Sequence, residues 1–184
     1  MLKIIRRVSD IRTGGDVERC HGIRHQTSYS VAKHTWGALA LLYILFPEYY
    51  ARLSPYLLFH DVAEAWVGDI PAPTKRFSSQ VRDACETMER RVHELLEIPF
   101  DGDLAPEDQR VLKACDHLEL YLWACEEQDA GNAHARCIAD ELTSYFRERP
   151  LAVPAQEIFE YIDQGGYHLM RHSTSGLIRE INNG

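Results

Sequence analysis

Residues 60–75 have the sequence HDVAEAWVGDIPAPTK, in which His60 and Asp61 are adjacent and Glu64 lies one helical turn further on. Imidazole nitrogens and carboxylate oxygens are metal ligands, so this short segment offers several of them. Asp69 follows Gly68 in the run Gly-Asp-Ile-Pro, where the glycine and proline are typical of a helix end and a loop. A His-Asp pair on its own is weak evidence, and its meaning depends on the other polar residues that meet it.

The chain around this segment has the composition of an ordinary globular protein. It has 184 residues, of which 45% are hydrophobic and 26% charged. This length supports one domain with a substantial core, so we expect a single domain over residues 1–184, with a core over 15–150 and C-terminal helices over 151–184. The five cysteines form no Cys-x-x-Cys pair, which argues against a disulfide framework and a cysteine zinc site.

Charge and hydropathy exclude several kinds of partner. The formal net charge is −8 and the sequence pI is about 5.6, which argues against a nucleic-acid polymer as partner. The longest apolar stretch, LALLYILF at residues 39–46, is too short to span a membrane. The start, MLKIIRRVSD, lacks the apolar region of a signal peptide. We therefore expect a cytoplasmic protein (in the host-cell cytoplasm if the source is viral) with no membrane partner.

Helical periodicity dominates the sequence, and strand signals are weak throughout. The predicted fold class is all-α, a single bundle of about six to seven helices. Ser54 and Pro55 predict a helix start, and Pro106 predicts another. Gly131 and Pro150 are typical of helix ends. The expected helices cover residues 31–46, 55–67, 79–97, 106–130, a segment between Asn132 and Pro150, and about 154–164. The expected loops cover 11–30 and 69–77.

Two polar residues fall on apolar helix faces. His34 shares a face with Val31 and Ala38, and Asp116 lies in the arc occupied by Leu112. Burying an unpaired carboxylate there costs several kcal/mol, so such a residue needs a partner or a metal. Each residue alone has an ordinary explanation, a hydrogen-bonded core histidine or a salt-bridged aspartate.

The residues at 60–64 would add a third source of ionisable groups. On a helix over 55–67, His60, Asp61 and Glu64 span about 100° of arc, so all three can face one cleft. Three helices would then each offer such a group to the interior. Two histidines and two aspartates without cysteine suit Mn²⁺, Fe²⁺, Co²⁺, Ni²⁺ or Zn²⁺.

The order His34, His60-Asp61, Asp116 resembles the HD superfamily of metal-dependent phosphohydrolases, whose ligands follow H…HD…D. The similarity is closer to its bacterial 5′-deoxynucleotidase (YfbR-like) branch. HDVAEAWVGDIPAPTK is similar to that branch's HDxxExxxGDxPxPxK signature, and VAKH to the lead-in to its first ligand. LKACDHLELYLWACEE, at residues 112–127, resembles the segment with the last aspartate. The match covers roughly residues 15–130.

The resemblance implies a role for each matching residue. One divalent transition metal (Co, Mn, Zn, Fe or Ni) would be held by His34, His60, Asp61 and Asp116. Arg19 would contact phosphate, with Lys75 and Lys113 as weaker candidates. Glu64 would act as an acid/base or water-orienting residue, and Asp69 would lie near the sugar 3′-hydroxyl. Lys113 has the alternative explanation of a solvated helix lysine.

The resemblance also implies an activity, a 5′-nucleotidase that removes phosphate from deoxyribonucleoside 5′-monophosphates. A deoxynucleoside triphosphate (dATP-type) triphosphohydrolase is the first alternative, and a non-catalytic nucleotide-binding HD module the second. The partner would be a nucleotide, and the chain is expected to form a homo-oligomer. Cys20 departs from the family, which commonly has an aromatic residue after the phosphate-binding arginine, in the sugar pocket. Sugar discrimination is therefore open, or is supplied by His21 or His25.

Overall fold

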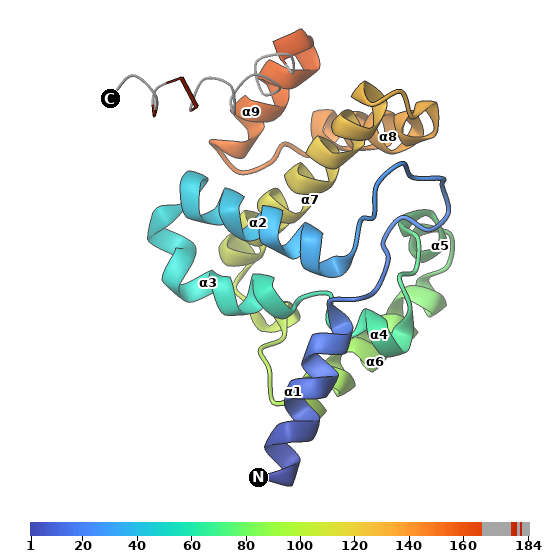
Figure 1. Ribbon diagram of the computed structural model, residues 1–184, viewed down its shortest axis with the longest axis vertical. Coiled ribbons are helices and arrows are strands. Elements are labelled where there is room, and N and C mark those ends of the chain that lie inside the picture. The colour runs from blue at the N-terminus through green and yellow to red at the C-terminus, as the bar shows by residue number, and fades with distance from the viewer. Residues whose placement is uncertain (167–177, 180, 182–184) are drawn as a thin grey trace.

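The structure is a computed structural model that describes residues 1–166, 178, 179 and 181, and every structural statement below concerns these residues. Helices dominate them, which confirms the all-α prediction (Figure 1). The α-helices are α1 (Leu2–Gly14), α2 (Val31–Leu45), α3 (Pro47–Phe59), α4 (Glu64–Val67), α5 (Ala72–Phe77), α6 (Ser79–Leu96), α7 (Pro106–Asp129), α8 (Arg136–Glu148) and α9 (Ala155–Tyr161). The short helices η1 (Asp101–Asp103), η2 (Ala133–Ala135) and η3 (Ile162–Gly166) complete the series.

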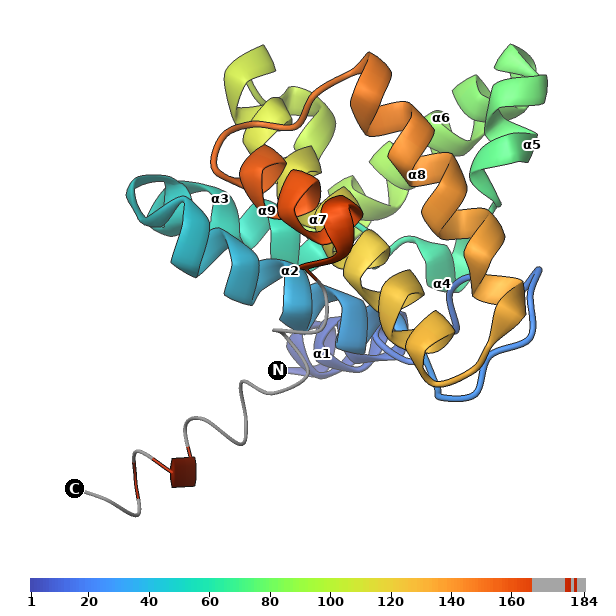
Figure 2. The same cartoon turned by 90° about the horizontal axis from the view of Figure 1, so that it is seen from above.

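Helix α7 is the central element, because α2, α3, α8 and α9 all pack against it. Figure 2 shows α7 between α2 and α3 on one side and α8 on the other. The largest fully buried side chains include Trp123 from α7, Leu42 from α2 and Phe146 from α8. Burying side chains of this size stabilises each by roughly 1.5–3 kcal/mol relative to exposure. The core therefore fixes α2 and α7 side by side, and with them His34 and Asp116.

Helices α2 and α3 meet at a corner formed by one residue. Phe46 is buried, and it is both the C-cap of α2 and the N-cap of α3. Pro47 begins α3, where its missing N–H would have had no helical partner anyway. The expected end of the first helix before Pro47 is confirmed, but the next helix begins immediately instead of at Ser54.

The predicted helix over 55–67 starts at the wrong residue and is interrupted, although its end before Gly68 is confirmed by α4. Pro55 lies inside α3, which ends at Phe59, and a turn over residues 60–63 separates α3 from α4. Two i→i−3 hydrogen bonds form this turn, Val62 N–H to Phe59 O (3.1 Å) and Glu64 N–H to Asp61 O (3.0 Å). The His-Asp pair therefore lies on a tight turn between helices, not on the face of a continuous helix.

Close packing of α1 explains part of this break. Gly14, the last residue of α1, is buried against the turn, and a Cβ there would lie 2.4 Å from Val62 Cγ2. Only glycine allows that approach. Helix α1 was not expected, and it replaces the first four residues of the predicted 11–30 loop. The short helix α5 was also missed, because Pro71 and Pro73 favoured a loop over 69–77.

The rest of the polar loop, residues 15–30, is held by specific bonds. Arg19 N–H donates to Tyr29 O and Val31 N–H to Val17 O, both at 2.8 Å, around an isolated antiparallel bridge between Glu18 and Ser30. The loop therefore presents Arg19 from a fixed backbone. No helix among the described residues is long and apolar enough to cross a bilayer. The predicted tail beyond Gly166 lies outside the described residues, apart from 178, 179 and 181.

Candidate metal centre

Three side chains, two from helices and one from the turn that follows α3, meet at the centre of the fold. His34 from α2, His60 from the end of α3 and Asp116 from α7 each offer one ligand atom, and these atoms lie within 4.8 Å of one another. His34 Nε2 lies 2.9 Å from Asp116 Oδ1 and 3.3 Å from His60 Nε2. His34 is completely buried, as its place on an apolar face predicted.

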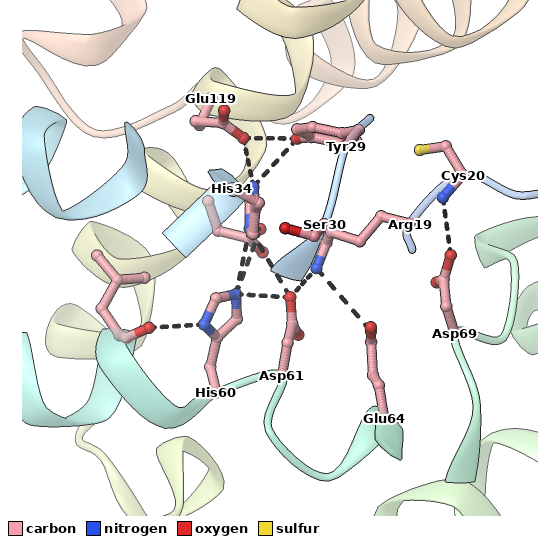
Figure 3. A network of polar contacts seen from close by, with 12 residues as sticks. Arg19, Cys20, Tyr29, Ser30, His34, His60, Asp61, Glu64, Asp69 and Glu119 are labelled. Atoms are coloured by element: carbon pink, nitrogen blue, oxygen red, sulfur yellow. Dashed lines mark hydrogen bonds and ion pairs between the residues drawn. The ribbon is translucent and has the colours of Figure 1, made fainter. Parts of the chain in front are cut away.

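Asp61 faces the same point from the turn after α3. Its Oδ2 atom lies 3.0 Å from His60 Nε2 and 3.8 Å from His34 Nε2. The same oxygen forms an ion pair with Arg19, which approaches from the 15–30 loop (Figure 3). The structure thus brings together all four residues predicted as metal ligands, and it adds the predicted phosphate-binding arginine.

Hydrogen bonds to the outer nitrogens orient both histidine rings. His60 Nδ1 lies 2.7 Å from Leu57 O, and His34 Nδ1 contacts a carboxylate oxygen of Glu119. Carbonyl and carboxylate oxygens only accept, so each Nδ1 donates its proton. The Nε2 lone pairs then point at the carboxylates of Asp61 and Asp116, an arrangement that requires positive charge between them. Two nitrogens and two oxygens so placed fit a divalent transition metal.

The titration of the cluster agrees with this requirement. Burial and the charge of Arg19 lower the pKa of His34, but hydrogen bonds with Asp116 and Glu119 outweigh them and raise it above its ordinary value. Burial alone would raise the pKa of Asp116, but hydrogen bonds from His34 and His60 hold it well below its usual range. Both shifts show that the carboxylates attract positive charge to the histidine side of the cluster.

Arg19 and Glu64 form the polar wall beside the cluster. Arg19 Nη1 lies 3.9 Å from Glu64 Oε1, and both side chains are about 12% exposed. Burial raises the pKa of Glu64 to about 7, although the charge of Arg19 opposes the shift. Glu64 Oε2 and Arg19 Nε are buried without a hydrogen-bond partner among the described residues. A carboxyl group with this pKa can both give and take a proton near neutral pH.

Asp69 supports the turn that carries Arg19. Cys20 has a left-handed backbone conformation (φ 54°), and its N–H donates to Asp69 Oδ2 at 2.8 Å. His21 Nδ1 lies 3.4 Å from the same oxygen, and His25 Nε2 lies 2.8 Å from Cys20 O. Burial raises the pKa of the Cys20 thiol to about 12, so the side chain is neutral. The predicted sugar-pocket residues therefore lie together beside Arg19.

The two predicted lysines occupy different positions. Lys75 on α5 pairs with Glu89 on α6 (Nζ–Oε1 3.2 Å), and its charge is close enough to affect the pKa of Glu64. Lys113 is exposed on α7, one helical turn before Asp116, and its charge helps to lower the pKa of His117, which burial lowers most. Lys75 thus lies near the Arg19–Glu64 wall, whereas Lys113 lies on the α7 side.

Sequence reasoning missed three residues that surround His34. Glu119 contacts its ring, Tyr29 Oη lies 3.1 Å from its Nδ1, and Gly37 leaves space for Glu119. One signal was available, because Glu119 is three residues after Asp116 and so shares its helix face. Tyr29 lies in a polar loop, where no periodicity marks it.

Comparison with known proteins agrees with this geometry. Residues 6–160 match the family model described as 5′-deoxynucleotidase YfbR-like. The chain belongs to the YfbR-like family. It is 30% identical over 121 residues to the 5′-deoxynucleotidase VP0926 of Vibrio parahaemolyticus, covering 59% of this chain and 61% of the relative. It is 29% identical over 98 residues to the 5′-deoxynucleotidase YfbR of Salmonella typhi, covering 46% and 49%. The chain thus spans about half to three-fifths of the length of these curated relatives.

A solved structure shares the fold. The cyanophage S-2L HD phosphohydrolase DatZ, bound to dA and one catalytic Zn²⁺ ion, superposes with a TM-score of 0.63 at 18% identity. The match covers 87% of this chain and 95% of DatZ. The expected HD-type helical architecture is therefore confirmed.

Proposed function

We propose that this protein is a metal-dependent phosphohydrolase that removes phosphate from deoxyribonucleoside 5′-monophosphates. The observation that carries the proposal is the meeting of His34, His60, Asp61 and Asp116 beside the buried guanidinium of Arg19. Two histidines and two aspartates that converge in the core without a cysteine are a donor set that suits a divalent transition metal. Membership of the YfbR-like family and the names of the curated relatives support the same activity.

The four residues would hold one divalent ion, which would supply Lewis-acid activation of water and of a phosphate oxygen. Arg19 would bind the phosphate, because its planar guanidinium matches phosphate geometry and its side chain is already held in place. Charge that spreads over the phosphoryl oxygens would then be neutralised by a fixed cation.

Glu64 would move the proton. With a pKa of about 7 it holds a proton in about half of the molecules at neutral pH, and its Oε2 has no competing partner among the described residues. It can orient or deprotonate the attacking water and return the proton to the leaving nucleoside oxygen. Asp69 would act near the sugar 3′-hydroxyl, with one carboxylate oxygen already bound to the Cys20 amide.

We infer the number of phosphate groups in the substrate from the positive charge near Glu64. Arg19 and Lys75 are the cations that the structure places near Glu64, and each already faces a carboxylate. A triphosphate would need more positive charge than this wall offers, whereas one phosphate dianion matches it. We therefore place a monophosphate ahead of a triphosphate.

The test is phosphate release from ribo- and deoxyribonucleoside mono- and triphosphates, with Co²⁺, Mn²⁺, Zn²⁺ or EDTA. Orthophosphate from deoxymonophosphates, absent with EDTA, supports the proposal. Release of triphosphate from deoxytriphosphates alone would replace it with the triphosphohydrolase. No release with any metal would favour the nucleotide-binding module.

Sugar choice is measured in the same assay. Cys20 and His21 are the side chains next to Arg19 on the side of Asp69. The matched variant is Cys20→Trp, which fills this place with an aromatic side chain. If Cys20 permits ribonucleotides, the wild type hydrolyses both sugars and Cys20→Trp lowers turnover of the ribonucleotide more. Equal discrimination in the two proteins would assign the choice to another residue.

A further inference from the structure

Glu119 is a carboxylate that the proposed reaction does not use, although it contacts the centre of the site. It projects from α7 toward the side of the His34 ring that faces away from His60 and Asp61 (Figure 3). Glu119 is only 9% exposed, and His34 is completely buried. A buried carboxylate that touches a ligand of the proposed metal can control the geometry of that ligand.

Counting protons shows what Glu119 does to the His34 ring. Tyr29 Oη donates its one proton to Glu119 Oε2 at 2.5 Å. His34 Nδ1, 3.1 Å from the same hydroxyl, therefore has Glu119 as its acceptor. An acceptor at Nδ1 keeps the proton on that nitrogen, so a neutral ring presents the lone pair of Nε2 to the cluster.

The second histidine offers a comparison within the same site. His60 has the same tautomer, but its Nδ1 proton goes to a neutral carbonyl, Leu57 O. A carboxylate in this position raises the basicity of the ring more than a carbonyl does. The two rings therefore differ in the strength of their outer partner, and His34 is the ring supported by a charge.

Packing holds Glu119 in place from two further directions. Gly37 lies one turn after His34 on α2, and a Cβ there would lie 2.7 Å from Glu119 Cγ and 2.9 Å from Oε1. Glu119 thus lies directly on the α2 backbone. Tyr29, its hydrogen-bond donor, stacks on Trp123 with ring centroids 4.1 Å apart. The carboxylate has little freedom to leave His34.

We propose that Glu119 is a positioning residue of the metal centre, fixing the tautomer, orientation and basicity of His34 together with Tyr29 and Gly37. This inference deepens the proposed function, because it assumes that the His34 cluster binds a metal. It assigns no contact between Glu119 and the substrate.

The test measures metal affinity without nucleotide. Co²⁺ binding to the metal-free protein is followed by isothermal titration calorimetry for the wild type, Glu119→Gln and the control Glu126→Gln. We expect Glu119→Gln to lower the Co²⁺ affinity about 10- to 100-fold, since loss of such outer partners typically costs that much. Glu126 lies on the same helix, two turns after Glu119, so Glu126→Gln makes the same chemical change away from His34. The Co²⁺ affinity of this control should match that of the wild type.

A second readout separates positioning from simple loss of stability. Long-range ¹H–¹⁵N spectra of the histidine rings report which nitrogen carries the proton. The wild type should show His34 protonated at Nδ1, and Glu119→Gln should shift the ring toward a mixture of tautomers while His60 is unchanged. Gly37→Ala, which displaces the carboxylate without removing it, should also weaken Co²⁺ binding several-fold. This variant tests the same point if Glu119→Gln does not fold.

The outcomes distinguish the inference from the proposed function. A folded Glu119→Gln protein that binds Co²⁺ within about twofold of the wild type would overturn the positioning role even if the wild type hydrolyses nucleotides. Conversely, weakened Co²⁺ binding in Glu119→Gln supports the role even if the wild type releases no phosphate from any nucleotide. In that case only the proposed phosphohydrolase activity fails.

Discussion

Helix α7 carries buried carboxylates at two places, and their surroundings differ. Near its middle, Asp116 and Glu119 meet the histidine cluster. At its C-terminal end, Glu127 accepts four hydrogen bonds, from the backbone N–H groups of Gln26 and Thr27, the Thr27 hydroxyl and the Asn132 amide. Both places bury negative charge on the same helix, but the first faces histidine rings, whereas the second meets backbone N–H groups, a hydroxyl and a side-chain amide.

The first place leaves polar atoms without donors or acceptors. Beside the cluster, Glu64 Oε2 and Arg19 Nε are buried and lack hydrogen-bond partners among the described residues. Such atoms cost stability, and native proteins keep them mainly where a ligand completes them. The end of α7 holds the 15–30 loop in place, whereas the middle of α7 faces the proposed metal site. Amide substitutions at the two places should therefore have opposite effects on activity and stability.

The largest effect is expected for Asp61→Asn. Removing one charge from the proposed metal ligands while keeping the side-chain shape should lower kcat/KM for the best deoxymonophosphate about 10³-fold or more, roughly 4 kcal/mol of transition-state stabilisation. The protein should stay folded, because Arg19 keeps Glu64 as a partner. Steady-state kinetics with saturating Co²⁺ and circular dichroism measure the two parts. Substantial remaining activity would remove Asp61 from the metal site.

The next effect is on stability, for Glu127→Gln. An amide group donates where the carboxylate accepted, so at least one buried donor from the loop or from Asn132 loses its acceptor. We expect a loss of about 2–3 kcal/mol in the free energy of unfolding. Chemical denaturation measures it, with Glu126→Gln as control, because Glu126 has no such set of donors. Equal stability of the two variants would show that Glu127 does not anchor the loop.

The sequence predicted those parts of the fold that local chemistry decides. Helices α2, α6 and α7 begin and end close to the expected residues, since proline, glycine and strong apolar periodicity bound them. His34 and Asp116 could be identified because a polar residue on an apolar stripe is costly. The choice between Pro47 and Pro55 as the start of α3 was not local. Both prolines can begin a helix, and the burial of Phe46 in the core favours Pro47 as the first residue of α3.

Contacts between distant segments explain the remaining differences. Glu119 acquires its role from Tyr29, 90 residues earlier, and from the close approach of Gly37. Helix α5 forms because Pro71 precedes it and Pro73 lies in its first turn, where a missing N–H has no cost. The turn over residues 60–63 depends on the packing of Gly14 against Val62. The contacts of Glu119 and Gly14 join distant segments and have no local signal, whereas the prolines of α5 are local and equally typical of a loop.

A third prediction concerns pH, because the pKa of Glu64 beside the histidine cluster and the pKa of Glu127 at the end of α7 are shifted in opposite directions. Burial raises the pKa of Glu64 to about 7, whereas hydrogen bonds from Gln26, Asn132 and Thr27 overcome burial and lower that of Glu127 to about 2. The folded protein holds the Glu64 proton more tightly than the unfolded chain, so this contribution to stability is lost as pH rises from about 4.5 to 7. The contribution of Glu127 is present above about 4.5 and is lost as pH falls toward 2.

Urea unfolding of the metal-free protein from pH 5 to pH 8 measures the first contribution. Glu64→Gln should remove a decline of about 1–2 kcal/mol across that range, after discounting for solvent and for Arg19. Glu86→Gln, which changes an exposed glutamate on α6, should leave the decline in place. If Glu64→Gln and the wild type show the same pH dependence, the pKa of Glu64 is ordinary, and its proposed role in proton transfer loses its support.

The smallest effects are expected at the edge of the site, where the two lysines distinguish the α5 side from the α7 side. Lys75 lies near Glu64, so Lys75→Gln should raise KM for a deoxymonophosphate about three- to fivefold with kcat nearly unchanged, consistent with one partly solvated phosphate contact. Lys113→Gln should change KM less than about twofold, because Lys113 is exposed on α7. Lys33→Gln, an exposed lysine on α2, is the matched control. A larger rise in KM for Lys113→Gln than for Lys75→Gln would place the phosphate beside α7 and His117. Arg19 would then have to reach the phosphate from the opposite side of the cluster, away from Glu64.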